Sequence, residues 1–306
     1  MRFSARMPNA VSSIAAAVLW SCIAVGCEAP PVVSQPDGPV PTAQQWADAQ
    51  ERRAATVPSL SLRGHADFEW RDSTGQHFDD GDFDIIFRAP SELCLRLSKL
   101  GQKALWIGAG GGQAWVIFLN EKPVRAVHRL VQPAGGAPER APAGLSDAMP
   151  GIERFFDPDR LAEALGIGRA SAADVQSIAW DSGRAAWAVS LPSRRVFVRG
   201  ESLLPIGIDW FDAAGAVTAS CTLGGFEWLR SEQAIAAAES SKPLVPTRIR
   251  VEVWSGGRTR AQGAPDGVLQ LAAAEPTDAS ARLKPQMFSW DDVRESTRPE
   301  VIVAWE

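Results

Sequence analysis

Strict alternation of apolar and polar side chains is the feature that most limits the folds open to this chain. In residues 60–71 every even-numbered position is apolar or glycine, and every odd-numbered position is polar or charged. A period of two over such a length is typical of a long β-strand with one apolar face and one face in water. Two further segments alternate less strictly: Phe83, Ile85 and Phe87 with Asp82, Asp84 and Arg88, and Leu93, Leu95 and Leu97 with Glu92, Arg96 and Ser98. The body of the chain is therefore predicted to be built on a sheet.

Short turn sequences separate a series of further strand candidates. The turns are Asp72–Gly75, Gly110–Gly112, Asp181–Gly183 and Asp212–Gly215. Aspartate, serine and glycine at such positions are typical of hairpin turns. The strand candidates are residues 60–71, 82–88, 93–98, 104–108, 113–119, 176–180, 185–191, 195–199, 205–211, 216–223, 248–254 and 268–273. Because hairpins dominate and no strand–helix–strand rhythm appears, the sheet is predicted to be antiparallel.

Two helices are predicted to accompany the sheet. The first spans residues 42–56, where Thr42 and Gln45 have the spacing of a capping box. The second spans residues 155–165 and carries a proline at its first helical position. Residues 131–150, which precede it, are rich in Pro, Ala and Gly and are predicted to form a long loop or a mobile flap.

The first 26 residues are predicted to be a lipoprotein signal peptide. Arg2 and Arg6 precede an apolar stretch that is too short to favour a membrane-spanning helix. The stretch ends in Ile23–Cys27, and small residues followed by cysteine resemble the lipobox of bacterial lipoproteins, with Ala24 in place of the usual leucine. Cys27 is then the lipidation site, and a plain secretory signal is the alternative.

The lipobox resemblance also implies a place in the cell. Glu28 follows the cysteine where an aspartate usually retains lipoproteins in the inner membrane. The resemblance therefore implies a cell-envelope protein at the periplasmic face of the outer membrane, held to that membrane by its N-terminal lipid. Residues 27–42 are Pro-rich and are predicted to be a tether. One domain is predicted for residues 43–306, with 131–150 as a loop insertion.

The order of the parts carries a further resemblance. A strand SLSLRGHADFEW is followed by DIIFRAPSELCLRL, by ALWIGAGGGQAWVI and by a DPDRLAEALG helix. LPIGIDWFDAAGAVTASCTLGGFEW comes next, and RLKPQMFSW and RPEVIV lie near the end. Over about residues 42–306 this order resembles the LolA/LolB lipoprotein-carrier superfamily, which includes RseB. The resemblance implies an α+β fold in which a strongly curved antiparallel β-sheet, an open half-barrel, is covered by a few helices and holds acyl chains in its cavity.

An apolar concave face of this kind needs a cover of helix, ligand or membrane, because exposed apolar surface costs about 25 cal/mol per Å². The candidate lining residues are Phe68, Trp70, Phe83, Ile85, Phe87, Leu95, Leu97, Trp106, Trp115, Ile117, Ile208 and Trp210. For each of them ordinary core packing is the alternative. The expected function is a non-catalytic carrier that binds acyl chains of lipoproteins or lipids. An RseB-like regulatory or scaffold protein that binds a protein partner is the alternative.

Several motifs that resemble catalytic or metal sites lack the residues that such sites need. Gly108–Gly112 is not followed by Gly-Lys-Ser/Thr or by a helix, which favours a hairpin turn over a phosphate loop. Asp181–Gly183 has no second copy to supply the paired carboxylate of an aspartic protease. The acidic run Asp79–Asp84 lacks EF-hand spacing, and the 3 histidines form no ligand pair. We therefore expect no enzyme, no metal and no cofactor, and the net charge of −5 argues against a nucleic-acid partner.

The cysteines of the predicted domain leave two alternatives open. Cys94 and Cys221 both lie in strand-like runs. An exported compartment permits a disulfide between them. Two separately buried thiols are equally compatible with the sequence, which does not give their distance.

Overall fold

A computed structural model describes residues 34–35, 39–72, 74–130, 158–168, 171–230, 243–254 and 259–304, with only the backbone at 72, 129, 158 and 159. The signal peptide predicted for residues 1–26, the lipidation site Cys27 and the loop 131–150 lie outside these ranges, as does most of the tether predicted for 27–42.

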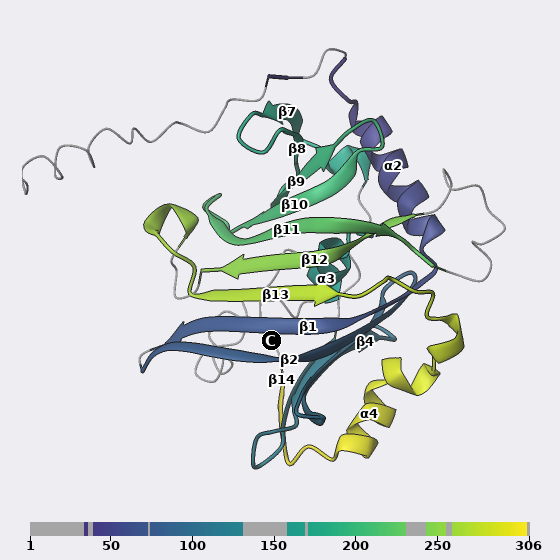
Figure 1. The fold of residues 1–306 in the computed structure, drawn as a ribbon, viewed down its shortest axis with the longest axis vertical. Coiled ribbons are helices and arrows are strands. Elements are labelled where there is room, and N and C mark those ends of the chain that lie inside the picture. Colours follow the sequence, from purple (N-terminus) through teal and green to yellow (C-terminus); the bar gives the residue numbers. More distant parts are fainter. Residues whose placement is uncertain are drawn as a thin grey trace, which may run out of the picture.

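One sheet of 14 strands forms the body of the protein (Figure 1). The strands are β1 (Ser59–Asp72), β2 (Gly75–Arg88), β3 (Glu92–Lys99), β4 (Gln102–Gly110), β5 (Gln113–Phe118), β6 (Arg125–Leu130), β7 (Ser177–Asp181), β8 (Ala186–Ser190), β9 (Arg194–Arg199), β10 (Leu204–Phe211), β11 (Val217–Trp228), β12 (Leu244–Val253), β13 (Gly267–Ala273) and β14 (Val301–Ala304). The helices are α2 (Ala43–Thr56), α3 (Pro158–Ala164) and α4 (Trp290–Thr297), with 3₁₀ turns η2 (Ala172–Asp174), η5 (Arg260–Gln262), η6 (Ser280–Arg282) and η7 (Pro285–Phe288).

The strand order is β14-β6-β5-β4-β3-β2-β1-β13-β12-β11-β10-β9-β8-β7. Two meanders, β1–β6 and β7–β13, are joined at the centre by antiparallel pairing of β1 with β13. Every neighbouring pair is antiparallel except β14 with β6. The predicted antiparallel sheet is therefore confirmed apart from this one parallel pair. The described sheet is open, because β7 and β14 stand at its two ends and do not pair with each other.

The sheet curves so that distant strands share one concave face. Leu95 on β3 and Trp210 on β10 line the same small cavity. In the strand order β2, β1, β13, β12 and β11 lie between them. Two strands so far apart can meet at one cavity only if the sheet bends around it.

The concave face holds the main hydrophobic core. One cluster of buried residues takes apolar side chains from β1 to β6 and from β8 to β13. Trp46 and Ala47 of α2 and Leu161 and Ala164 of α3 pack into the same cluster. The predicted capping box of α2 is present, since the Thr42 hydroxyl accepts from Gln45 N and the Gln45 side chain accepts from Thr42 N. Helices α2 and α3 therefore cover the concave side.

The C-terminal segment covers part of the convex side. Met287 and Phe288 pack over Cys94 on β3, and Trp290 of α4 packs over Trp115 on β5. Ser289 caps α4 by accepting from Asp292 N. The strands β3 to β5 are therefore buried on both faces.

Two glycine positions explain local geometry. Gly111 and Gly112 have φ of 59° and 73° and form the turn between β4 and β5, so the predicted hairpin turn is confirmed. At Gly64 a Cβ would lie 1.9 Å from the Ala272 carbonyl oxygen. Only glycine lets β13 approach β1 at this place, and β13 is the strand that joins the two meanders.

Candidate functional site

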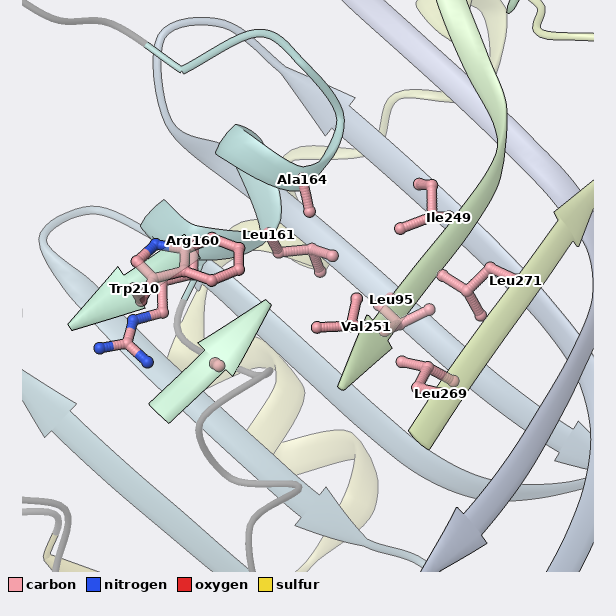
Figure 2. A pocket seen from close by; sticks show the side chains of 10 residues that line it. Leu95, Arg160, Leu161, Ala164, Trp210, Ile249, Val251, Leu269 and Leu271 are labelled. Atoms are coloured by element: carbon pink, nitrogen blue, oxygen red, sulfur yellow. The ribbon is translucent and has the colours of Figure 1, made fainter. Parts of the chain in front are cut away.

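A small cavity lies between α3 and the concave face of the sheet (Figure 2). Its volume is about 20 Å³, which is room for about one water molecule. Its lining residues are Leu95, Arg160, Leu161, Ala164, Trp210, Ala219, Ile249, Val251, Leu269 and Leu271. The lining is almost wholly apolar, with the Arg160 guanidinium and the Trp210 indole at one end (Figure 2).

Helix α3 lies on this face because its apolar residues point to the sheet. Leu161 and Ala164 are three residues apart and share one side of the helix. Leu165 and Ile167, just after the helix, are also buried in the concave core. Gly166, with φ of 71°, ends the helix in the left-handed conformation.

Polar contacts at Glu163 hold α3 to β9 and β10. The carboxylate pairs with Arg194, with Nε and Oε1 2.9 Å apart, and both side chains are mostly buried. Trp210 Nε1 donates to Glu163 Oε2 at 3.1 Å. An ion pair that is screened little by solvent contributes more to stability than an exposed pair, so Glu163 is the main polar anchor of α3.

Arg53 links the two covering helices to the sheet. Its Nε donates to the Gly166 carbonyl oxygen at 2.5 Å, and its Nη2 donates to the Leu244 carbonyl oxygen. Burial lowers the pKa of Arg53 to about 10, and the guanidinium is therefore still charged at neutral pH. Gln50 Nε2, one turn earlier on α2, donates to the Leu203 carbonyl oxygen at 3.2 Å.

An open groove of about 750 Å³ continues from the concave face between α2 and the β7–β8 hairpin. Trp180 and Trp187 form an edge-to-face pair there, with ring centroids 5.3 Å apart. Trp187 and Leu203 belong to both the groove and the concave core. The lining residues are Pro39, Pro41, Gln45, Asp48, Ala49, Arg52, Trp180, Ala185, Trp187, Arg199, Gly200, Glu201 and Leu203. Ligand pockets typically measure about 300–1,000 Å³, so the groove, unlike the small cavity under α3, has the size of a ligand site.

Most of the residues that the sequence proposed as cavity lining lie on the concave side. Phe83, Ile85, Phe87, Leu95, Leu97, Ile208 and Trp210 are buried in its core. Phe68 packs at the margin of that core. Trp70 stacks on His77 near the tip of the β1–β2 hairpin. Only Leu95 and Trp210 reach the cavity under α3. A ligand-binding role for these residues stays a prediction.

Trp106, Trp115 and Ile117 lie on the opposite side of the sheet from that group. They pack under η7 and α4 on the convex face. The register explains this, because Trp106 pairs with Arg96, which lies on the polar face of β3. These three residues are core of the convex side and do not contribute to a site on the concave face.

The two cysteines of the domain are unpaired and buried. Cys221 lies in the concave core, whereas Cys94 lies under the convex cover. Opposite faces of one sheet keep the two sulfur atoms apart, so of the two alternatives the structure has separate thiols. Burial raises the pKa of both thiols.

The lining residues that the sequence analysis did not propose come from α3 and from the C-terminal meander. Ile249 and Val251 lie on β12, and Leu269 and Leu271 lie on β13. The alternation in both strands marks them as inward-facing. What the sequence did not show is that α3 lies over this part of the sheet and not over another.

No group of three or more His, Cys, Asp or Glu in the described ranges could hold a metal ion. Among the helices that the structure describes, none is long and apolar enough to cross a membrane.

The fold is similar to those of several solved structures. They include a LolA superfamily protein, NE2245, from Nitrosomonas europaea, at 12% identity and a TM-score of 0.46 over 82% of this chain and 99% of that one. A domain from Vibrio parahaemolyticus named for outer membrane lipoprotein sorting has 8% identity and a TM-score of 0.48 over 82% and 98%. A DUF1329 family protein from Desulfovibrio piger has 11% identity and a TM-score of 0.46 over 83% and 99%. No protein-family model matches the sequence, and no curated protein matches it.

Proposed function

We propose that the protein is a non-catalytic cell-envelope protein that shelters acyl chains of lipids or lipoproteins against the concave face of its sheet. The acyl chain enters from the groove beside α2 and displaces α3. The protein is held at its membrane by a lipid on Cys27, and Cys27→Ala is expected to release it into the soluble fraction. A Cys27→Ala protein that stays in the membrane fraction would contradict the anchor but not the binding site.

The observation that carries the proposal is the nature of the cover on the concave face. Side chains from β3, β10, β11, β12 and β13 form an apolar wall. Against that wall lies a helix of 7 residues. Such a helix is too short to be stable by itself, so it remains in place through Leu161, Ala164 and the Glu163 anchor. An acyl chain can take the place of α3, because it would make apolar contacts with the wall similar to those of Leu161 and Ala164.

The test measures acyl binding by the full-length chain. Lipid extraction and mass spectrometry of the purified protein are expected to show co-purifying acyl species. After delipidation, 11-(dansylamino)undecanoic acid is expected to bind saturably. Ala219→Trp places a large ring on the β11 part of the wall, which stays in place when α3 is displaced, and it is expected to weaken this binding at least about tenfold, since an overfilled site excludes the ligand.

Thr222→Trp is the matched control, because Thr222 is exposed on the convex side of β11. It introduces the same ring on the same sheet and is expected to leave binding unchanged. Circular dichroism of both variants checks that the sheet is intact. Absence of acyl species together with absence of saturable probe binding, or equal binding by both variants, would overturn the proposal.

A further inference from the structure

The β1–β2 hairpin carries a stretch of free strand edge. β2 begins at Gly75, but β3 pairs with it only from Asp82 to Arg88. Residues 75–81 pair with β1 on one side, and no strand of the described chain pairs with their other side. Figure 1 shows this end of the hairpin reaching past the end of β13.

A free edge offers backbone groups for a further strand. In an antiparallel pair every second residue points its N–H and C=O groups away from its neighbour strand. At Gln76 and Phe78 these groups face outward with no ladder partner in the described structure. At Asp80 the C=O faces outward, while the N–H donates to the Asp79 carboxylate at 2.9 Å. Addition of an extended peptide to such an edge is a common mode of protein recognition.

The side chains around the open edge of β2 indicate the chemistry of a strand that could pair with it. Phe78 is 70% exposed, which is unusual for so large an apolar side chain beside an open edge. Next to it is a hollow of about 350 Å³, in which every titratable side chain is an acid. Its lining residues are Asp67, Phe68, Glu69, Phe78, Asp79, Asp80, Val268 and Gln270.

The acids are not all neutralised within the protein. Asp79 pairs with Lys99, and Asp67 lies 3.3 Å from the His65 ring. Asp80 has no ion-pair partner among the described residues. Charged side chains on an edge also hinder indiscriminate pairing with other strands. An exposed phenylalanine favours association with other strands. Avoidance of such pairing therefore does not by itself explain why this edge carries Phe78 together with the acidic side chains.

We propose that residues 75–81 of β2 accept an extended, basic segment of a partner protein as an additional strand. Gln76, Phe78 and Asp80 alternate onto one face of the strand. The partner strand therefore places an apolar side chain beside Phe78 and a lysine or arginine beside Asp80 on the same face. This site lies outside the lining of the concave cavity, and it does not depend on acyl binding.

The test uses labelled synthetic peptides and the full-length chain, with binding measured by fluorescence anisotropy. The probe has the sequence Lys-Thr-Val-Thr-Lys-Thr-Val-Thr-Lys, in which lysine and valine alternate along one face of the strand. A second peptide of the same sequence carries N-methyl groups on alternate residues, which remove the donors of one edge without changing the charge. A third peptide has glutamate in place of lysine. The first is expected to bind, and both others are expected to bind at least about tenfold more weakly.

Two variants with the same change of charge separate this edge from general attraction. Asp80→Lys is expected to weaken binding of the lysine peptide about tenfold, because it replaces an attraction by a repulsion. Glu51→Lys, on an exposed position of α2, is expected to change binding less than twofold. Equal binding of the methylated and unmethylated peptides, equal effects of the two variants, or no binding of the lysine peptide would each overturn the proposal.

Discussion

Glu163→Gln tests whether α3 is a separable cover. The substitution keeps an oxygen that accepts from Trp210 Nε1 but removes the charge that pairs with Arg194. The side chains of Arg194 and Glu163 are only 21% and 15% exposed, so solvent screens this pair little. Arg194 Nε makes no hydrogen bond within the described part of the chain, so the contact is an ion pair. Breaking a fully buried ion pair costs about 3–5 kcal/mol and an exposed pair contributes about 0–1 kcal/mol, so we take about 2 kcal/mol as the loss for this mostly buried pair.

The loss should appear in the local opening of α3. A change of about 2 kcal/mol corresponds to roughly 30-fold in an equilibrium constant. The amides of Leu165, Gly166 and Ile167 report on the helix end, because they donate to carbonyl oxygens of residues 161–163. Hydrogen exchange at these amides, followed by mass spectrometry, is expected to accelerate roughly 30-fold in the variant.

Glu121→Gln is the matched control, because it removes the charge from another pair with a 2.9 Å separation, that of Arg125 Nε with Glu121 Oε2. Glu121 lies in the connection between β5 and β6, which does not line the cavity under α3, and the substitution is expected to leave exchange at residues 165–167 unchanged. Acceleration of less than about threefold in Glu163→Gln would refute the role of this anchor. Equal acceleration in β12 and β13 would show that the helix opens only with the whole domain.

Two further outcomes follow from buried and hydrogen-bonded groups. Since burial raises the pKa of the Cys94 and Cys221 thiols, alkylation by iodoacetamide at pH 8 is expected to leave both unmodified in the native protein and to modify both in urea, as peptide mapping would show. Burial alone would raise the pKa of Asp278, but hydrogen bonds from Ser59 and Ser280 outweigh it and lower that pKa. The contribution of Asp278 to stability is therefore present above the unfolded-state pKa of about 4 and is lost as pH falls through the lower folded-state pKa. The difference in free energy of unfolding between the wild type and Asp278→Asn is expected to be constant above about pH 5 and to shrink below pH 4 in urea titrations.

The sequence predicts strands where one face of the sheet is in water. The alternation in residues 60–71 gives both the strand and its inward face, since Leu60, Leu62 and Ala66 are buried in the concave core. In β4 the alternation of apolar and polar residues is absent, because Leu105 and Ile107 face the concave core while Trp106 packs against the convex cover. A strand buried on both faces is apolar throughout, so its residues cannot be assigned to a face without their cross-strand partners.

The parts of the site that sequence reasoning missed depend on contacts between segments far apart in the chain. β14 pairs in parallel with β6, at Val301 with Arg125, and no turn between them signals that pairing. The same holds for α3, whose helical pattern and terminal glycine predict a helix but not the strands on which it lies. Local patterns specify elements, whereas the position of a cover is set by tertiary packing.

The small volume under α3 makes acyl binding depend on the opening of this helix. A space of about 20 Å³ does not admit an acyl chain, so binding at this wall requires that α3 first opens. The apparent affinity is then the intrinsic affinity multiplied by the open fraction. Glu163→Gln, which weakens the closed state by about 2 kcal/mol, is therefore expected to bind 11-(dansylamino)undecanoic acid more tightly, by up to roughly 30-fold. Unchanged or weaker binding in a variant whose α3 exchanges faster would show that the chain does not bind beneath this helix, and would leave the groove beside α2 as the site.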